Sequence, residues 1–246
     1  MDETQYRYWQ YFQFPGRSKW VEKIWSEAFG DQYPVGLDHY GFVTKHDLEV
    51  FKSWLNLEPG STLLDIGCGR GGPGLKIAEQ LDLKLIGIDP VKEAVEQAQA
   101  FQSHFNLTYP ATFQVGEFYD LPVPNASADA VIAVDSLWTV PNKPAGLNIV
   151  KLKMKPGAKC MFTFWDYKGQ DAVRLLEFSG LKCIHHEETP NGNSYQEKVY
   201  DGILQYEQEL REEMGAAANM LINEAKITKP TLKMSVRRIY VFELEG

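Results

Sequence analysis

Residues 64–72 read LDIGCGRGG, and this stretch decides the fold. A short apolar strand runs here into a glycine-rich turn, and residues 72–80 after it are predicted to form a helix. Glycine lets a backbone approach a ligand closely and adopt a positive φ, and the N-terminus of a helix offers free N–H groups. The stretch therefore predicts a cofactor site at the end of a strand.

The glycine spacing alone does not define the cofactor. Gly67, Gly69 and Gly72 also match the G-x-G-x-x-G pattern of dinucleotide-binding proteins, which is a weak signal by itself. Asp65 favours another ligand, because a carboxylate before the turn repels a pyrophosphate and suits a cationic group such as the methionyl ammonium of S-adenosylmethionine. Asp89, at the end of the next strand, can accept two ribose hydroxyls in either cofactor class.

Strands and helices alternate along the rest of the chain, which is typical of a parallel sheet. The helices are expected at 72–80, 91–105, 143–154 and 171–179, and the strands at 62–66, 84–88, 111–115, 130–134, 159–165, 181–185 and 232–244. We expect an α/β fold with a Rossmann-like, doubly wound, mostly parallel seven-stranded sheet and an antiparallel last strand.

The segment before the first strand is expected to be helical. Apolar residues recur at helical spacing in 19–29, and Thr44 with Asp47 resembles a capping box that opens a helix ending near Leu57. If this helix runs antiparallel to the first strand, it starts near the carboxyl edge of the sheet. We therefore expect a helical segment that covers this edge.

A second helical segment is expected before the last strand. About forty residues separate the last two predicted strands, too many for a hairpin turn. Val199, Ile203 and Leu210 belong to a helical stripe inside this gap, so we expect an insertion that acts as a lid. The predicted organisation is one domain over 1–246, with an N-terminal helical segment at 1–57, a core at 58–187 and 231–246, and a cap at 188–230.

Composition excludes several classes of partner. The 246 residues carry a formal charge of −8 and no basic patch, which argues against nucleic acid. No signal-peptide pattern and no run of about 18 apolar residues is found, so we expect a cytoplasmic protein with no membrane partner. We expect a monomer or homodimer.

Three widely spaced cysteines fit neither disulfides nor a metal site, and no metal is expected.

Three further motifs follow the glycine turn, namely QVGEF at 114–118, LPVP at 121–124 and SADAV at 127–131. From about residue 62 to 166 the sequence resembles the class I S-adenosylmethionine-dependent methyltransferases, especially the branch that modifies small molecules and natural products. The resemblance implies S-adenosylmethionine as cofactor and S-adenosylhomocysteine as product. It also implies that Glu117, in place of the commoner Asp, contacts the adenine amino group and that Phe118 packs on the ring. The expected cofactor contacts are Asp65, Gly67, Cys68, Gly69, Asp89, Pro90, Glu117, Phe118 and Val134.

The catalytic residues are less clear from the sequence. Asp166 follows the fifth strand, where methyltransferases of this branch often carry an Asp that works with a His on the preceding strand–helix loop. That loop carries Thr139 where the His is expected. Either His39 or His46 takes the role, or the acceptor needs no strong base, as for an amine that loses its proton to water.

The expected reaction is methyl transfer to oxygen or nitrogen, less probably carbon, of a small aromatic or apolar metabolite. Aromatic side chains predict the acceptor pocket. The expected acceptor contacts are Tyr11, Tyr40, Trp138, Thr139 and Trp165. Two alternatives remain, a methyltransferase fold that binds the cofactor without methyl transfer, as a cyclase or binding module, and a nicotinamide-dependent oxidoreductase. The chain has no Tyr-x-x-x-Lys pair for hydride transfer, which argues against the oxidoreductase.

Overall fold

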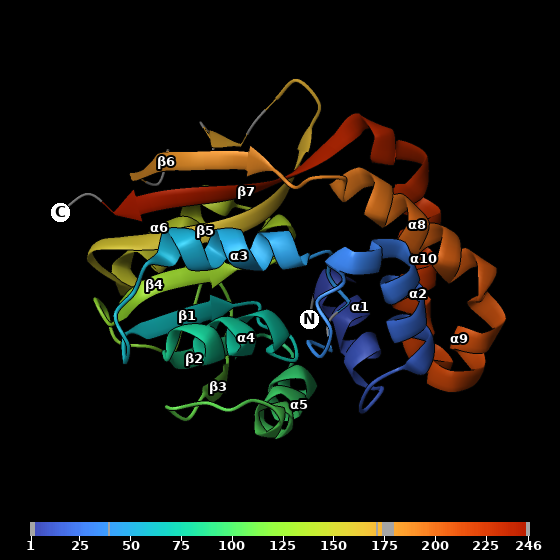
Figure 1. The fold of residues 1–246 in the computed structure, drawn as a ribbon, viewed down its shortest axis with the longest axis horizontal. Coiled ribbons are helices and arrows are strands. Elements are labelled where there is room, and N and C mark those ends of the chain that lie inside the picture. The colour runs from blue at the N-terminus through green and yellow to red at the C-terminus, as the bar shows by residue number, and fades with distance from the viewer. Residues whose placement is uncertain (1–2, 39, 171, 174–179, 245–246) are drawn as a thin grey trace.

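A seven-stranded sheet is the centre of the molecule (Figure 1). The computed structural model describes residues 3–38, 40–170, 172–173 and 180–244. Their strand order is β3-β2-β1-β4-β5-β7-β6; β7 is antiparallel to both of its neighbours, and the other strands run parallel. The strands are β1 (Thr62–Ile66), β2 (Lys84–Asp89), β3 (Thr112–Val115), β4 (Ala128–Ala133), β5 (Met154–Tyr167), β6 (Leu181–Glu188) and β7 (Ser235–Leu244). The predicted fold, including its antiparallel last strand, is confirmed.

Helices cover both faces of this sheet. The helices are α1 (Glu3–Phe12), α2 (Lys19–Phe29), α3 (Lys45–Leu55), α4 (Gly72–Leu81), α5 (Lys92–Phe101), α6 (Lys143–Lys153), α8 (Gly192–Gln205), α9 (Glu207–Met214) and α10 (Ala218–Thr228). Side chains alternate along β1, so Leu63 joins a core with Phe51 of α3 and Leu75 of α4. Its neighbour Leu64 joins Leu147 of α6 in the core on the other face. The sheet is therefore doubly wound.

Helix α3 begins where its sequence predicts. The hydroxyl of Thr44 accepts a hydrogen bond from the backbone N–H of Asp47 at 3.1 Å, and the Asp47 carboxylate accepts one from the N–H of Thr44 at 2.9 Å. This reciprocal capping box satisfies two N–H groups at the helix N-terminus. The helix ends at Leu55, because Asn56 takes a left-handed conformation with φ 41°.

Helices α8, α9 and α10 form a helical cap, residues 192–228, beside the carboxyl ends of the parallel strands (Figure 1). The cap packs against α1 and α2 through a separate apolar core that includes Ile24, Trp25, Tyr200 and Leu221. Strand β6 is parallel to β5, so the chain leaves the sheet at its carboxyl edge before it enters the cap. The N-terminal helices and the cap thus cover one edge together.

Several predicted boundaries are wrong in detail. The helix predicted at 91–105 ends at Phe101 and continues as one 3-10 turn (Gln102–His104). The last strand starts at Ser235 and not at 232, because residues Lys229–Met234, with a proline in the first turn, form a 3-10 helix. The helix predicted at 171–179 lies mostly outside the described residues. Within the part of the chain that the structure describes, no helix has the length and apolarity to cross a membrane.

Candidate active site

The glycine turn after β1 folds back on itself between two strands. The N–H groups of Gly67 and Cys68 both donate to the carbonyl of Ile88, at 2.7 and 3.1 Å. Gly67 has φ 71°, and a Cβ there would lie 2.4 Å from the Cβ of Ser136. Both the backbone conformation and the close approach of Ser136 therefore require glycine at position 67.

Asp89 stands at the end of β2, directly beside this turn. Its carboxylate accepts hydrogen bonds from the N–H groups of Gly69 and Val91, each at 2.9 Å. Burial raises the pKa of Asp89 to about 6, so the group is mostly ionised at neutral pH. A carboxylate has about four acceptor sites, so two remain for hydroxyl groups of a ligand.

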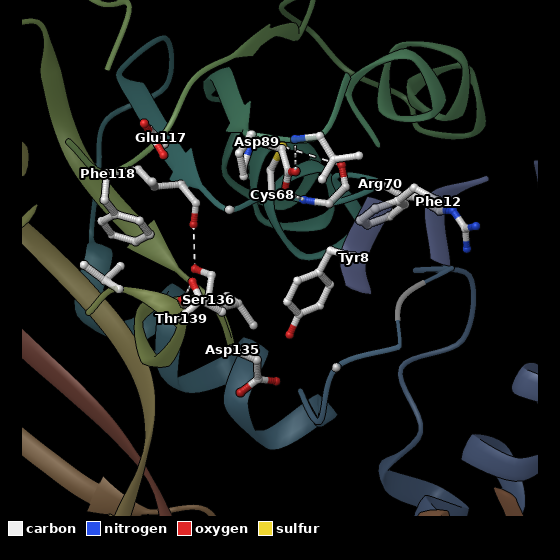
Figure 2. A pocket seen from close by; sticks show the side chains of 18 of the residues that line it. Tyr8, Phe12, Cys68, Arg70, Asp89, Glu117, Phe118, Asp135, Ser136 and Thr139 are labelled. Carbon is white, nitrogen blue, oxygen red and sulfur yellow. Dashed lines mark hydrogen bonds between the residues drawn. The ribbon is translucent and has the colours of Figure 1, made fainter. Parts of the chain in front are cut away.

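A cavity opens between the glycine turn and the ends of β1, β2, β3 and β4. Figure 2 shows Asp89, Cys68, Glu117 and Phe118 around it, with Tyr8 projecting from α1. We call it the glycine-loop cavity. It is lined by eight of the predicted cofactor contacts, namely Gly67, Cys68, Gly69, Asp89, Pro90, Glu117, Phe118 and Val134.

Asp65, the ninth predicted contact, does not line the glycine-loop cavity. Its side chain is buried and accepts a hydrogen bond from the backbone of Gly74, where a Cβ would lie 2.4 Å from the carboxylate. Strand alternation explains this, because position 65 faces α4 and not the end of the strand. Burial, with a smaller effect of Asp89, raises the pKa of Asp65 to about 8.

Helix α1, part of the predicted N-terminal helical segment, forms a wall of the glycine-loop cavity, although none of its residues was among the predicted cofactor contacts. Tyr8 and Phe12 line the cavity. The guanidinium of Arg70 donates to the carbonyl of Phe14 at 2.9 Å and to Gln97 at 2.6 Å, and the Gln97 amide donates to the carbonyl of Phe12 at 2.6 Å. Tyr8 and Phe12 lie four residues apart, which is the spacing of one face of a helix, so the sequence carries a signal for their common orientation.

A second cavity, of about 320 Å³, lies between the sheet edge and the helical cap, and we call it the aromatic cavity. Four predicted site residues line it, namely Tyr40, Trp138, Trp165 and Asp166. Tyr8, Tyr40, Gly41 and Asp135 line both cavities. These four residues therefore lie between the two cavities, and we call them the shared wall.

Two other predicted acceptor contacts are placed differently. Thr139 lines the glycine-loop cavity, and its hydroxyl donates to the carbonyl of Ser136 at 2.7 Å. Tyr11 lines neither cavity. It is buried, with its ring centroid 4.6 Å from that of Tyr40 and 5.1 Å from the guanidinium of Arg70, so it packs behind the wall.

Asp135 is the charged member of the shared wall, and it also escaped the sequence analysis. Its carboxylate accepts hydrogen bonds from the N–H of Phe42 at 2.7 Å, the hydroxyl of Thr163 at 2.8 Å and the guanidinium of Arg237 at 3.0 Å. Arg237 is fully buried and also contacts Asp47 at 2.7 Å. Burial opposes the charge of Asp135, but Arg237 outweighs it and keeps the pKa of Asp135 below its usual value.

The predicted catalytic residues do not come together. Asp166 lines the aromatic cavity, where its carboxylate accepts hydrogen bonds from the hydroxyl of Tyr240 and from Arg238, the latter at 3.1 Å. His46 lines neither cavity, because α3 turns it toward β6, where its Nε2 lies 2.9 Å from Glu187. His39 lies outside the described residues.

Comparison with known proteins supplies the class. A family model described as "Methyltransferase domain" matches residues 57–223. The chain is 30% identical over 142 residues, 56% of its length, to phosphoethanolamine N-methyltransferase 1 of Arabidopsis thaliana. It is 31% identical over 143 residues, again 56% of its length, to 27-O-demethylrifamycin SV methyltransferase of Amycolatopsis mediterranei (strain S699). The chain spans 28% and 52% of the lengths of these relatives.

Solved structures agree on the fold. A SAM-dependent methyltransferase from Geobacter sulfurreducens in complex with S-adenosylhomocysteine superposes with a TM-score of 0.64 at 13% identity, covering 92% of this chain and 98% of that one. The chain belongs to the methyltransferase domain family. The prediction of a methyltransferase is therefore confirmed at the level of the family, and its predicted cofactor is S-adenosylmethionine.

The glycine-loop cavity fits this cofactor chemically. It combines a turn that excludes a Cβ at Gly67, an acidic hydroxyl acceptor in Asp89 and an apolar side chain in Phe118. Among the residues that the structure describes, no group of His, Cys, Asp or Glu is arranged to hold a metal ion.

Proposed function

We propose that this protein transfers the methyl group of S-adenosylmethionine to an oxygen or nitrogen atom of a small molecule held in the aromatic cavity. One observation carries the proposal: the two cavities share Tyr8, Tyr40, Gly41 and Asp135. A ligand in the first cavity therefore lies next to a ligand in the second, with this wall between them. Holding two reactants in line contributes roughly 7 to 11 kcal/mol to such a reaction.

The residues of the glycine-loop cavity have distinct roles in this proposal. Asp89 accepts the two ribose hydroxyls, Glu117 accepts from the adenine amino group, and Phe118 packs on the adenine ring. Asp65 positions the start of α4 through Gly74 and does not touch the ligand. When bound, the cofactor supplies an electrophilic methyl group.

Asp166 is the residue we propose to take a proton from the acceptor. It lies in the aromatic cavity, and Arg238 and Tyr240 hold its carboxylate in place. The helical cap closes the cavity from the other side with Gln196, Tyr200 and Glu224. Chain segments 1–57 and 188–230 thus act together as the cover of the acceptor site.

Two measurements test this function. S-adenosylhomocysteine at 100 times its dissociation constant should stabilise the protein by about 2.7 kcal/mol, and NADPH should not. Labelled S-adenosylmethionine incubated with a metabolite library should then label a small-molecule product. Stabilisation by NADPH alone contradicts the proposal, and cofactor binding without any labelled product favours the inert or cyclase alternative.

A further inference from the structure

One buried polar atom in the aromatic cavity has no partner among the residues that the structure describes. It is the side-chain carbonyl oxygen, Oε1, of Gln196 on α8. The Gln196 side chain is only 4% exposed, and it lines the cavity. A buried carbonyl without a donor is costly, so this atom points to a ligand that brings an N–H or O–H group.

The neighbours of Gln196 fix which of its two polar atoms is free. Its Nε2 lies 2.6 Å from the hydroxyl of Tyr200, and that hydroxyl lies 2.9 Å from Oε1 of Glu224 on α10. The Tyr200 hydroxyl donates its single proton to Glu224. The Tyr200 oxygen must then accept from the Gln196 amide N–H, which leaves the carbonyl oxygen for a donor.

The charges around the cavity indicate what kind of donor fits. Its lining contains three carboxylates, Asp135, Asp166 and Glu224, and among its described residues no Lys, Arg or His. Asp135 and Asp166 are matched from behind by Arg237 and Arg238. Glu224 forms no such ion pair with a described residue. The charges that act on it are those of Arg7, which lowers its pKa, and Asp135, which raises it.

Burial raises the pKa of Glu224, and this effect, to which Asp135 adds, outweighs the hydrogen bond from Tyr200 and the charge of Arg7. A carboxylate that is hard to ionise alone gains most from a cationic ligand. Aromatic side chains surround the same space, and their faces attract cations such as ammonium groups. They are Tyr8, Tyr40, Phe42, Trp138, Trp165, Tyr167 and Tyr200.

We propose that the acceptor is an amine that is cationic at neutral pH and carries at least one N–H, bound between the Gln196 carbonyl and the Glu224 carboxylate of the helical cap. Before the transfer this nitrogen gives a proton to Asp166, which lines the same cavity, and its freed lone pair then forms the bond to the methyl group as the bond from sulfur to methyl breaks. This inference rests on the proposed methyl transfer and names its substrate class. Both residues belong to the cap, on α8 and α10, so the amine also joins two cap helices that meet at Tyr200.

The test compares amines with neutral analogues of the same shape, on protein saturated with S-adenosylhomocysteine. Phenethylamine is paired with 2-phenylethanol, and tryptamine with tryptophol, and binding is measured by titration calorimetry at pH 7. Each amine should bind at least about tenfold more tightly than its alcohol. Glu224→Gln should weaken amine binding at least about tenfold and leave alcohol binding within about twofold.

Glu197→Gln is the matched control, because Glu197 is the exposed neighbour of Gln196 on α8 and undergoes the same change of charge. It should keep the amine preference. Binding of S-adenosylhomocysteine shows that each variant is folded. If Glu224→Gln does not bind it, Gln196→Met, which removes the free carbonyl, tests the same preference.

Equal binding of amines and alcohols by the unchanged protein overturns the inference, as does an amine preference that survives both Glu224→Gln and Gln196→Met. Methyl transfer that proceeds only to neutral acceptors also overturns it, while leaving the proposed function intact. Failure of the proposed function looks different, because S-adenosylhomocysteine then does not bind or no acceptor of any charge is methylated.

Discussion

The glycine-loop cavity and the aromatic cavity are neighbours but are built in different ways. The first is made mainly of short runs of sequence at the ends of consecutive strands, with α1 and the loop before α3 as an added wall, and many of its contacts involve the backbone. The second collects single side chains from α1, the loop before α3, the end of β5 and the helical cap. Substitutions in the glycine-loop cavity should therefore act locally on the ligand bound there. Substitutions in the aromatic cavity should disturb contacts between distant segments.

The largest expected effect tests this dependence on distant contacts. Arg237→Leu leaves Asp47 and Asp135 buried without their cation, so it should lower the free energy of unfolding by about 3–5 kcal/mol. Urea denaturation measures the change. The control is Arg211→Leu, which removes a surface ion pair with Glu207 and should cost under about 1 kcal/mol. Equal losses in the two variants would show that Arg237 does not hold the shared wall.

Asp166→Asn should affect the reaction in the aromatic cavity without affecting cofactor binding in the glycine-loop cavity. Loss of the proton acceptor should lower kcat by about 10²-fold while the affinity for S-adenosylhomocysteine stays within about twofold. The exposed Asp201 on α8 provides a control, Asp201→Asn, that should keep full turnover. An Asp166→Asn variant as active as the unchanged protein removes Asp166 from the mechanism.

Asp89→Ala should act in the opposite sense. It removes a charged hydrogen-bond acceptor from the glycine-loop cavity, so the dissociation constant of S-adenosylhomocysteine should rise by roughly 10- to 100-fold in calorimetry. Glu96→Ala, an exposed carboxylate on the following helix, should change it little. An unchanged dissociation constant for Asp89→Ala contradicts the role of this residue in holding the ribose.

The smallest expected effect concerns Asp65 and depends on pH. Its pKa is about 8 in the folded protein and lies near 3.9 when unfolded, so between these values the folded state binds more protons. Stability then falls as the pH rises through this window. The Asp65→Asn variant has no such loss. The difference between its free energy of unfolding and that of the unchanged protein should therefore increase by more than about 1 kcal/mol from pH 5 to pH 7.5, as measured by urea denaturation. A constant difference contradicts the raised pKa.

Much of the fold could be predicted, because each core strand is a short apolar run and each turn carries its own glycine, proline or cap. The capping box of Thr44 and Asp47 formed where it was expected. Helix α1 falls within the predicted helical segment at 1–57, but its residues were not assigned to the cofactor cavity, because their place there comes from tertiary packing. Boundaries failed where a 3-10 turn replaced a strand or helix end, as at Lys229–Met234.

The two cavities differed just as much in what the sequence revealed. Gly67 and Asp89 could be found because the signals for a tight turn and for the end of a strand lie in the few residues around them. Asp135, Gln196 and Glu224 could not, because their importance comes from Arg237, Tyr200 and an enclosed space that only tertiary packing creates. Asp65 was assigned a direct contact because spacing alone does not tell which face of a strand a side chain takes.

The position of β7 has a consequence for how the protein is made. This strand lies between β5 and β6, yet it follows the whole helical cap in the chain, so a ribosome delivers Arg237 after every other part of the shared wall. Until then Asp47 and Asp135 are two like charges with no cation between them, and their repulsion opposes closure. We therefore expect the aromatic cavity to close only once β7 has joined the sheet.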